Sequence, residues 1–214
     1  MNIKTGAAVL IALGLHGCQV NPRFSKLPLK EQKVLIPLTG SAEELAAGEG
    51  LPQSAEPVAS ADEIKIYKGT STFVNEYIDK SQNQFTHLYI YGSFCKPCVA
   101  EMPAILQMHR DRQSTSFLMV SPENWGNLVW IKAFLYRNKV FTPTYVLDLD
   151  RYGDEYGVAK RYQKFVDEIY PGHPEIGGFP THFILNKQHK VLFAASGANK
   201  FNAAVLDSVM QANR

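Results

Sequence analysis

The sequence has little net charge, few cysteines and no long apolar run. Its 214 residues include 22 basic and 20 acidic side chains. Because these charges are interspersed, the chain has neither the basic surface expected of a nucleic-acid-binding protein nor a polybasic patch for a membrane surface. It shows no internal repeat. A hydrophobic fraction of 45% is enough to bury one ordinary α/β core, so we expect one domain with extensions.

The apolar run near the N-terminus, from Ala7 to Leu15, follows a single base, Lys4. It has about half the length needed to span a bilayer, which indicates a secretory signal segment. The next residues, Leu15-His16-Gly17-Cys18, resemble the lipobox of bacterial lipoproteins, in which the cysteine is lipidated and becomes the first mature residue. The alternative is a plain cleaved signal peptide with an incidental cysteine.

Three parts of the chain differ in composition. We expect a lipoprotein signal peptide at 1–17, the lipidated Cys18 and a proline-rich tether at 18–61, and a folded domain at 62–214. This organisation predicts a protein that is anchored by lipid in the bacterial cell envelope and faces the periplasm, on either the inner or the outer membrane. In an exported protein, disulfides form and persist.

The segment 62–214 alternates strand patterns with helix patterns. The large aromatic residues around the third helix are expected to pack in the core or against helices, and not to bind a ligand; they are Trp125, Trp130, Phe134 and Tyr136. We expect strands at 63–67, 87–91, 116–121, 144–149, 180–185 and 190–196, and helices at 72–80, 99–109, 127–138, 155–170 and 202–213.

Two of the three cysteines, Cys95 and Cys98, lie where the strand at 87–91 meets the next helix. Thiol–disulfide exchange needs one thiol that ionises near neutral pH and a second that resolves the mixed disulfide. The helix N-terminus and Lys96 favour a thiolate at Cys95, and Pro97 suits a first helical turn because it needs no N–H donor there. Cys98, inside that turn, is expected to be the more buried, resolving thiol.

Glu101 lies three residues after Cys98, on the same helical face. Its carboxylate is therefore a candidate to take the proton of Cys98 when the mixed disulfide is resolved. The alternative is a solvated acidic residue that only complements the helix dipole or pairs with a nearby base.

The motif Phe94-Cys95-Lys96-Pro97-Cys98, followed by Glu101 and Pro103, resembles the thioredoxin-fold proteins of the TlpA/ResA/CcmG group. The resemblance implies an α/β fold with a central mixed sheet flanked by helices, a central insertion and a membrane-tethered, reducing thiol–disulfide oxidoreductase. It also implies a cis-proline opposite the cysteine pair, which matches Phe179-Pro180. We expect substrate contacts at Phe94, Lys96, Pro97, Phe179 and Pro180.

Three features depart from that family pattern. Phe94 replaces the usual tryptophan, which keeps the bulk and loses the indole N–H. Tyr89 occupies the position at which thioredoxin has a buried aspartate, so Glu101 becomes the leading candidate for proton transfer. The segment Ala159 to Ile176 is expected to be an extra helix and loop, which either influences the choice of partner or only elaborates the scaffold.

Two other function classes remain open at this point. A zinc site would need histidines beside the cysteine pair, and the chain offers neither a close histidine pair nor a second cysteine pair; His87 and His182 fall in expected strands. Two thiolates suffice for Cu(I), so a copper-binding metallochaperone is one alternative. A redox-silent lipoprotein scaffold with a permanent disulfide is the other.

The function that we predict is exchange of dithiol for disulfide with exported proteins. In this hypothesis Cys95 attacks, Cys98 resolves, Glu101 transfers protons, and a membrane thiol transporter supplies the electrons, as the resemblance implies. We expect no cofactor and no metal.

Overall fold

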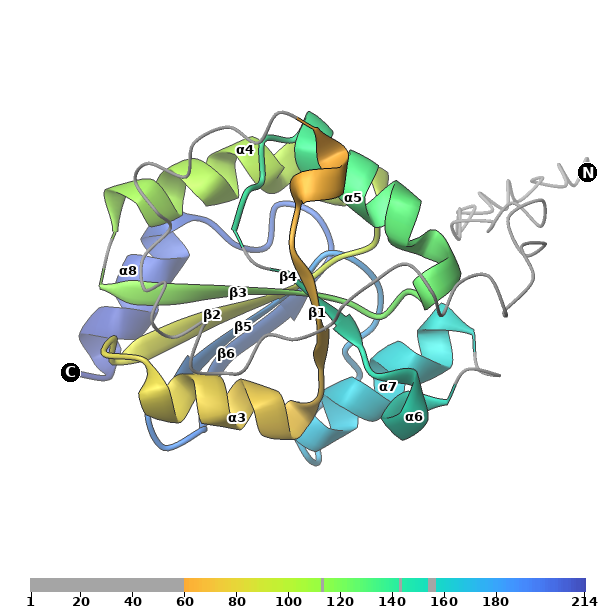
Figure 1. Ribbon diagram of the computed structural model, residues 1–214. Helices are drawn as coiled ribbons and strands as arrows, with labels where there is room; N and C mark the ends of the chain where they lie inside the picture. The colour runs from red at the N-terminus through yellow and green to blue at the C-terminus, as the bar shows by residue number, and fades with distance from the viewer. Residues whose placement is uncertain (1–59, 113, 143, 154–156) are drawn as a thin grey trace, which may run out of the picture.

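Six strands form one mixed sheet at the centre of the domain (Figure 1). The computed structural model describes residues 60–112, 114–142, 144–153 and 157–214. The sheet order is β1-β4-β3-β2-β5-β6, with parallel pairing from β1 to β2 and antiparallel pairing of β5 and β6. The strands are β1 (Ile66–Gly69), β2 (Phe85–Ile90), β3 (Thr115–Ser121), β4 (Thr144–Leu147), β5 (Thr181–Asn186) and β6 (Val191–Ser196).

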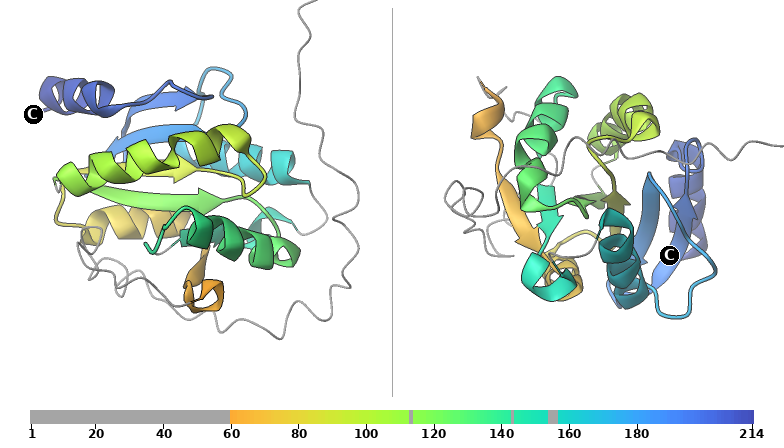
Figure 2. Two further views of the ribbon diagram at one scale, coloured as in Figure 1. Left: turned by 90° about the horizontal axis from the view of Figure 1, so that it is seen from above. Right: turned by 90° about the vertical axis from the view of Figure 1, so that its right-hand side faces the viewer.

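Helices cover both faces of the sheet, which gives three layers (Figure 2). One apolar cluster lies between the sheet and α4, α5 and α8, and a second lies between the sheet and α3, α6 and α7. The helices are α3 (Ser71–Lys80), α4 (Lys96–Asp111), α5 (Leu128–Arg137), α6 (Leu149–Tyr152), α7 (Val158–Ile169) and α8 (Ala203–Ala212).

The central strand β2 explains why two separate cores form. All six of its residues are buried. Because side chains alternate along a strand, Tyr89 faces the α4 layer while Leu88 and Ile90 face the α7 layer. The continuous apolar and aromatic run that predicted this strand reflects burial on both of its faces.

The chain order of the elements settles the topology. The unit β2-α4-β3 is followed by α7 and then by β5-β6-α8, with the cysteine pair at the start of α4. The four strands of these units lie in the order β3-β2-β5-β6, with β5 antiparallel to β2. The fold is thioredoxin-like. The central insertion is α5-β4-α6, and β4 extends the sheet next to β3.

The structure has the expected helix and loop within Ala159 to Ile176, but the helix is not an addition to the basic fold. Its helix, α7, carries Tyr162, Phe165 and Val166 into the second apolar cluster and covers one face of the sheet. Without this layer the side chains of Leu88 and Ile90 would lose much of their apolar cover. The helix is therefore an integral part of the fold, and the insertion precedes it.

Thr70 caps α3 by accepting a hydrogen bond from the Phe73 amide. Phe134 is buried as expected, whereas Trp130 and Tyr136 are exposed on the outer side of α5. The side chain of Trp125 lies outside the described part of the chain.

The expected signal peptide, Cys18 and nearly all of the tether also lie outside the described residues. Within the described part, no helix has the length and apolar character needed to cross a membrane.

Candidate active site

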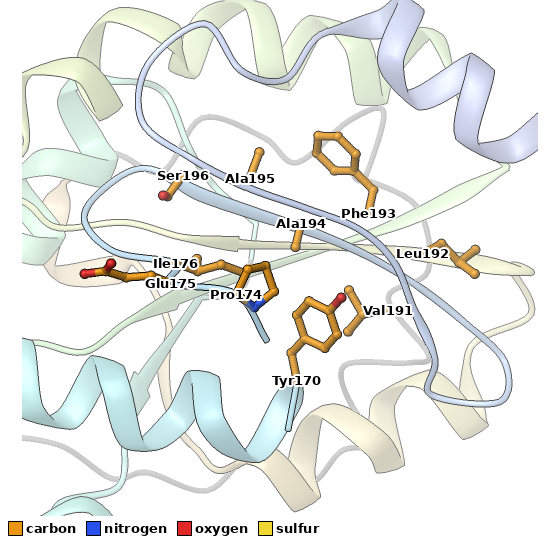
Figure 3. Close-up of a pocket in the computed structure, with 10 residues that line it drawn as sticks. All are labelled: Tyr170, Pro174, Glu175, Ile176, Val191, Leu192, Phe193, Ala194, Ala195 and Ser196. Atoms are coloured by element: carbon orange, nitrogen blue, oxygen red, sulfur yellow. The ribbon is translucent and has the colours of Figure 1, made fainter. Parts of the chain in front are cut away.

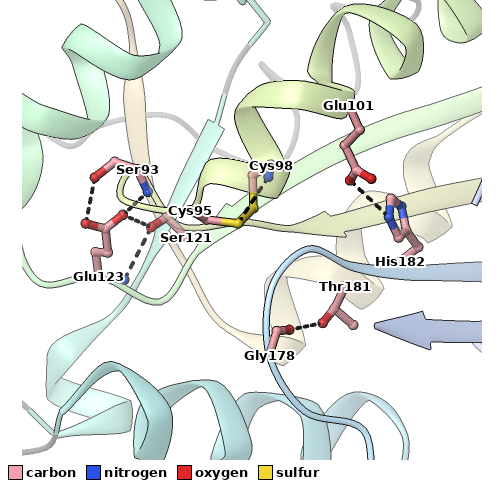
Figure 4. Close-up of a disulfide and its surroundings, with 9 residues drawn as sticks. All are labelled: Ser93, Cys95, Cys98, Glu101, Ser121, Glu123, Gly178, Thr181 and His182. Carbon is pink, nitrogen blue, oxygen red and sulfur yellow. Dashed lines mark hydrogen bonds and ion pairs between the residues drawn. A yellow bond between two sulfur atoms is a disulfide. The ribbon is translucent and has the colours of Figure 1, made fainter. Parts of the chain in front are cut away.

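The cysteine pair sits at the N-terminus of α4, at the end of β2 (Figure 4). Cys95 and Cys98 form a disulfide, and the Cys98 amide donates a hydrogen bond of 3.1 Å to the Cys95 Sγ atom. Cys95 is therefore the N-cap of the helix, with its sulfur where the helix dipole favours negative charge. Cys95 is 3% exposed and Cys98 is fully buried.

The two residues between the cysteines are accessible to solvent. Lys96 is exposed and Pro97 is half-buried, and both lie in the first turn of α4. Proline fits this turn because its missing N–H would have no intrahelical partner. The buried disulfide thus has an exposed dipeptide beside it.

Two aromatic rings border the pair on the side of β5. Phe94 is 43% exposed, and its ring lies edge-to-face with that of Phe179, with centroids 5.9 Å apart. The peptide bond between Phe179 and Pro180 is cis. A Cβ added at Gly92 would lie 2.9 Å from the Phe94 ring, so glycine allows this ring to fold back over the loop. The structure therefore brings Phe94 and Phe179 together.

Helix α7 packs against the Phe179 ring. The Tyr162 ring packs edge-to-face on Phe179 at 5.2 Å, and its hydroxyl lies 2.9 Å from the Thr181 hydroxyl. Thr181 in turn donates a hydrogen bond of 2.6 Å to the Gly178 carbonyl (Figure 4). Helix α7 thus holds the loop that carries Phe179.

Glu101 points inward from α4, and its side chain is only 10% exposed. The Oε1 atom lies 3.2 Å from Nε2 of His182, although neither carboxylate oxygen has a well-aligned hydrogen bond to a described residue. The Tyr89 hydroxyl also faces this carboxylate: burial, and then Glu101, raise the pKa of Tyr89. The alternative of a solvated first-turn residue does not fit this position.

Two further histidines extend from His182 into the core. His87 Nε2 lies 3.1 Å from His182 Nδ1, and His87 Nδ1 lies 2.7 Å from Nε2 of His109. Sequence reasoning placed His87 and His182 in strands, where they are packed and hydrogen-bonded, but it did not connect them to Glu101. The three histidines come from β2, α4 and β5, so only the packing of these elements shows that their side chains lie in one line.

Sequence reasoning also missed Glu123, which is fully buried just after β3. Its carboxylate accepts hydrogen bonds from the Ser93 amide and hydroxyl, at 2.5 and 2.8 Å (Figure 4). It also accepts one from the Asn127 side chain at 3.0 Å. Burial raises the pKa of Glu123, and these donors partly oppose the shift. Because β2 and β3 are parallel, their carboxyl ends meet, and this signal could have suggested that Glu123 holds the cysteine loop.

The grooves on the surface of the domain include one beside β6 and one beside α4. The first, of about 270 Å³, runs along β6 and beside the segment Pro174–Ile176, and neither cysteine lines it (Figure 3). The other, of about 550 Å³, lies between α4 and the segment that leads into α8, and Glu101 lines it. The second groove therefore reaches a predicted site residue from solvent.

A metal centre has no support in the described residues. No group of three or more histidine, cysteine, aspartate or glutamate side chains there is arranged to hold a metal ion. The nitrogens of His87 face those of His109 and His182 pairwise instead of converging on a common point.

Comparisons with known proteins give structural similarity alone. No family model matches the sequence, and no curated protein matches it. Among solved structures, the thioredoxin domain of a thiol-disulfide oxidoreductase from Bacteroides vulgatus is 14% identical, with coverage of 60% of this chain and 81% of that domain and a TM-score of 0.45. StoA from Bacillus subtilis is 22% identical, with coverage of 61% and 84% and a TM-score of 0.43.

A thiol:disulfide interchange protein of the thioredoxin family from Chlorobium tepidum is similar at 16% identity, with coverage of 60% of this chain and 79% of that chain and a TM-score of 0.42. At such identities and TM-scores, the assignment of the thioredoxin-like fold rests on the strand order and the helix positions given above.

Proposed function

We propose that the domain is a thiol–disulfide oxidoreductase whose reactive group is the Cys95–Cys98 pair. The observation that carries this proposal is the disulfide at the N-terminus of α4, where Cys95 Sγ accepts the Cys98 amide. The same hydrogen bond and the helix dipole would stabilise a Cys95 thiolate after reduction. The exposed Phe94 and the neighbouring Phe179 provide an apolar face next to that sulfur.

The reaction proceeds in two exchange steps. In the reduced form, the Cys95 thiolate attacks a substrate disulfide, forms a mixed disulfide and releases one substrate thiolate. The Cys98 thiol then loses its proton to Glu101 and attacks Cys95 Sγ, which releases the second substrate thiolate. The substrate gains two electrons and the protein keeps the Cys95–Cys98 disulfide. Of the two protons on the substrate thiols, one balances the proton that Cys98 gives up through Glu101, and the other comes from solvent. The reverse sequence oxidises a dithiol.

The cellular setting is part of the proposal. The signal-like segment and Cys18 support a lipid-anchored protein that faces the periplasm, with exported disulfide-containing proteins as substrates. By its resemblance to the TlpA/ResA/CcmG group, the domain would work in the reducing direction, with electrons from a membrane thiol transporter.

The substitution Cys98→Ala tests the proposal, because it removes the resolving thiol and should trap the mixed disulfide on Cys95. We expect the full chain with this substitution, expressed in an exporting bacterium, to yield a reducible adduct in non-reducing electrophoresis and mass spectrometry. The matched control, Cys95→Ala combined with Cys98→Ala, retains Cys18 and should give none.

Other results would oppose the exchange reaction. If the double variant forms the adduct equally well, the adduct is on Cys18 and does not support exchange at Cys95. A stoichiometric metal on the reduced unmodified protein, without any adduct on the single variant, would favour the copper-binding alternative. A disulfide that resists mild reduction would favour the redox-silent scaffold.

A further inference from the structure

A line of three buried imidazoles leads away from Glu101. His182 and His87 are fully buried and His109 is 4% exposed. Their rings are stacked, with centroids 5.3 Å apart for His87 and His182 and 5.0 Å apart for His87 and His109. With Glu101 Oε1 at 3.2 Å from His182 Nε2, the four side chains form one continuous series of close contacts.

The protonation of the inner histidines gives this series a direction. Burial, with His109 and His182 as smaller causes, lowers the pKa of His87 well below its ordinary value. Burial, with Arg112 and His182 as smaller causes, lowers the pKa of His109 to about 3. Both imidazoles are therefore neutral near pH 7, and each has one N–H donor and one nitrogen acceptor. When His182 also carries a single N–H, every N–H points the same way along the line.

The two ends decide which way the N–H groups point. If they point toward Glu101, the carboxylate receives a donor from His182, and the unpartnered Nδ1 of His109 is only a lone pair. If they point away, a His182 lone pair faces the carboxylate, and a buried N–H at His109 has no acceptor among the described residues. An ionised Glu101 favours the first arrangement, because it removes the repulsion and gives a charge-assisted contact.

We propose that His182 is the positioning residue of Glu101 and that His87 and His109 fix the tautomer that it presents. The inference rests on the proposed exchange reaction. His182 Nε2–H holds Oε1, which leaves Oε2 as the oxygen that takes the proton of Cys98. Among the described residues, the titratable groups that interact with Glu101 are His182 from β5 and Tyr89 from β2, and Cys98 precedes Glu101 by three residues on α4.

The proton balance of this step is simple. The Cys98 S–H bond breaks, a Glu101 O–H bond forms, and the sulfur keeps the electron pair with which it attacks Cys95. Glu101 lines the groove between α4 and the segment that leads into α8, so the proton afterwards leaves to solvent on that side. The imidazole line stores no net charge and serves to orient the acceptor.

Two measurements test the inference independently of each other. In the full chain labelled with ¹⁵N, the imidazole nitrogen shifts should show Nε2–H tautomers at His182, His87 and His109 near neutral pH. Nδ1–H at His182 would overturn the proposal. This measurement needs no substitution and no substrate, so it stands even if the protein exchanges no disulfide with a test substrate.

The kinetic test compares His182→Phe with His182→Gln, which restores an N–H donor. With a disulfide-containing test peptide, His182→Phe should slow the resolving step about tenfold at neutral pH and move the midpoint of its pH–rate profile upward, because the carboxylate loses its donor. His182→Gln should recover most of the rate. Formation of the mixed disulfide in the Cys98→Ala background should not change.

The matched control is His189→Gln, in the β5–β6 turn, where His189 pairs with Asp79. It should leave the profile unaltered. An unchanged profile in His182→Phe would overturn the inference while the exchange reaction stands, whereas absence of any exchange by the unmodified protein would overturn the proposed function.

Discussion

Mild acid should destabilise this domain in a window set by His87 and His109. Both are neutral in the folded state because burial lowers their pKa values, while in the unfolded chain each returns to its ordinary value of 6.5. As pH falls below 6.5, the unfolded state takes up two protons that the folded state does not bind, so the free energy of unfolding decreases. The stability that these residues contribute is present above pH 6.5 and is lost toward acid.

The magnitude follows from the linkage relation. Between pH 6.5 and about pH 5, each neutral histidine costs about 1.6 kcal/mol, so the two together cost about 3 kcal/mol. This is a large part of the roughly 5 to 15 kcal/mol typical of a folded domain. His173 does not enter this window. Hydrogen bonds to the Pro174 carbonyl and Asp167 raise its pKa, so its contribution is present below pH 6.5 and is lost above it.

Urea unfolding followed by circular dichroism at several pH values in this window measures the effect. The unmodified protein should show the full decrease, and His109→Gln about half of it, whatever the stability of the variant at neutral pH. His189→Gln is the matched control for loss of a partly exposed histidine, and it should retain the full decrease. If the free energy of unfolding is flat across the window, or if His109→Gln shows the full decrease, the assignment of neutral buried imidazoles is wrong.

Two more predictions concern the carboxylates on either side of the disulfide. Glu101→Gln should slow resolution of the mixed disulfide about 100-fold near neutral pH in stopped-flow measurements, with unfolding unchanged; an unaltered rate would remove it from proton transfer. Glu123→Ala leaves the partly buried Ser93 amide without its acceptor and should lower the free energy of unfolding by about 2 to 3 kcal/mol, measured in urea. Glu175→Ala, at an exposed residue, is its control. An equal loss of unfolding free energy in both variants would contradict the role of Glu123 in holding the cysteine loop.

Local features of the site were accessible from the sequence. Cys95, Cys98 and Glu101 lie within seven residues at a strand–helix junction, where helical geometry alone sets their relative positions. The strands were also predictable, because burial on two faces leaves a continuous apolar run, as in β2. The error over α7 arose because an amphipathic helix does not reveal whether it belongs to the basic fold or to an insertion.

Contacts between distant segments required the structure. His182 lies across from Tyr89 in the register of β2 on β5, and this register brings it to His87 and Glu101. A shift of one residue would turn His182 to the other face of the sheet, and no local pattern excludes that shift. Glu123 likewise reaches Ser93 only because β2 and β3 pair in parallel.

The sequence by itself therefore determined the alternation of strands and helices, the helix that carries the cysteine pair and the first carboxylate beside it, since these depend on periodicities of a few residues. The tertiary structure alone decided what surrounds that carboxylate: three imidazoles from β2, α4 and β5, and a second buried carboxylate behind the loop. Their placement depends on strand register and helix packing, which join residues up to 95 positions apart.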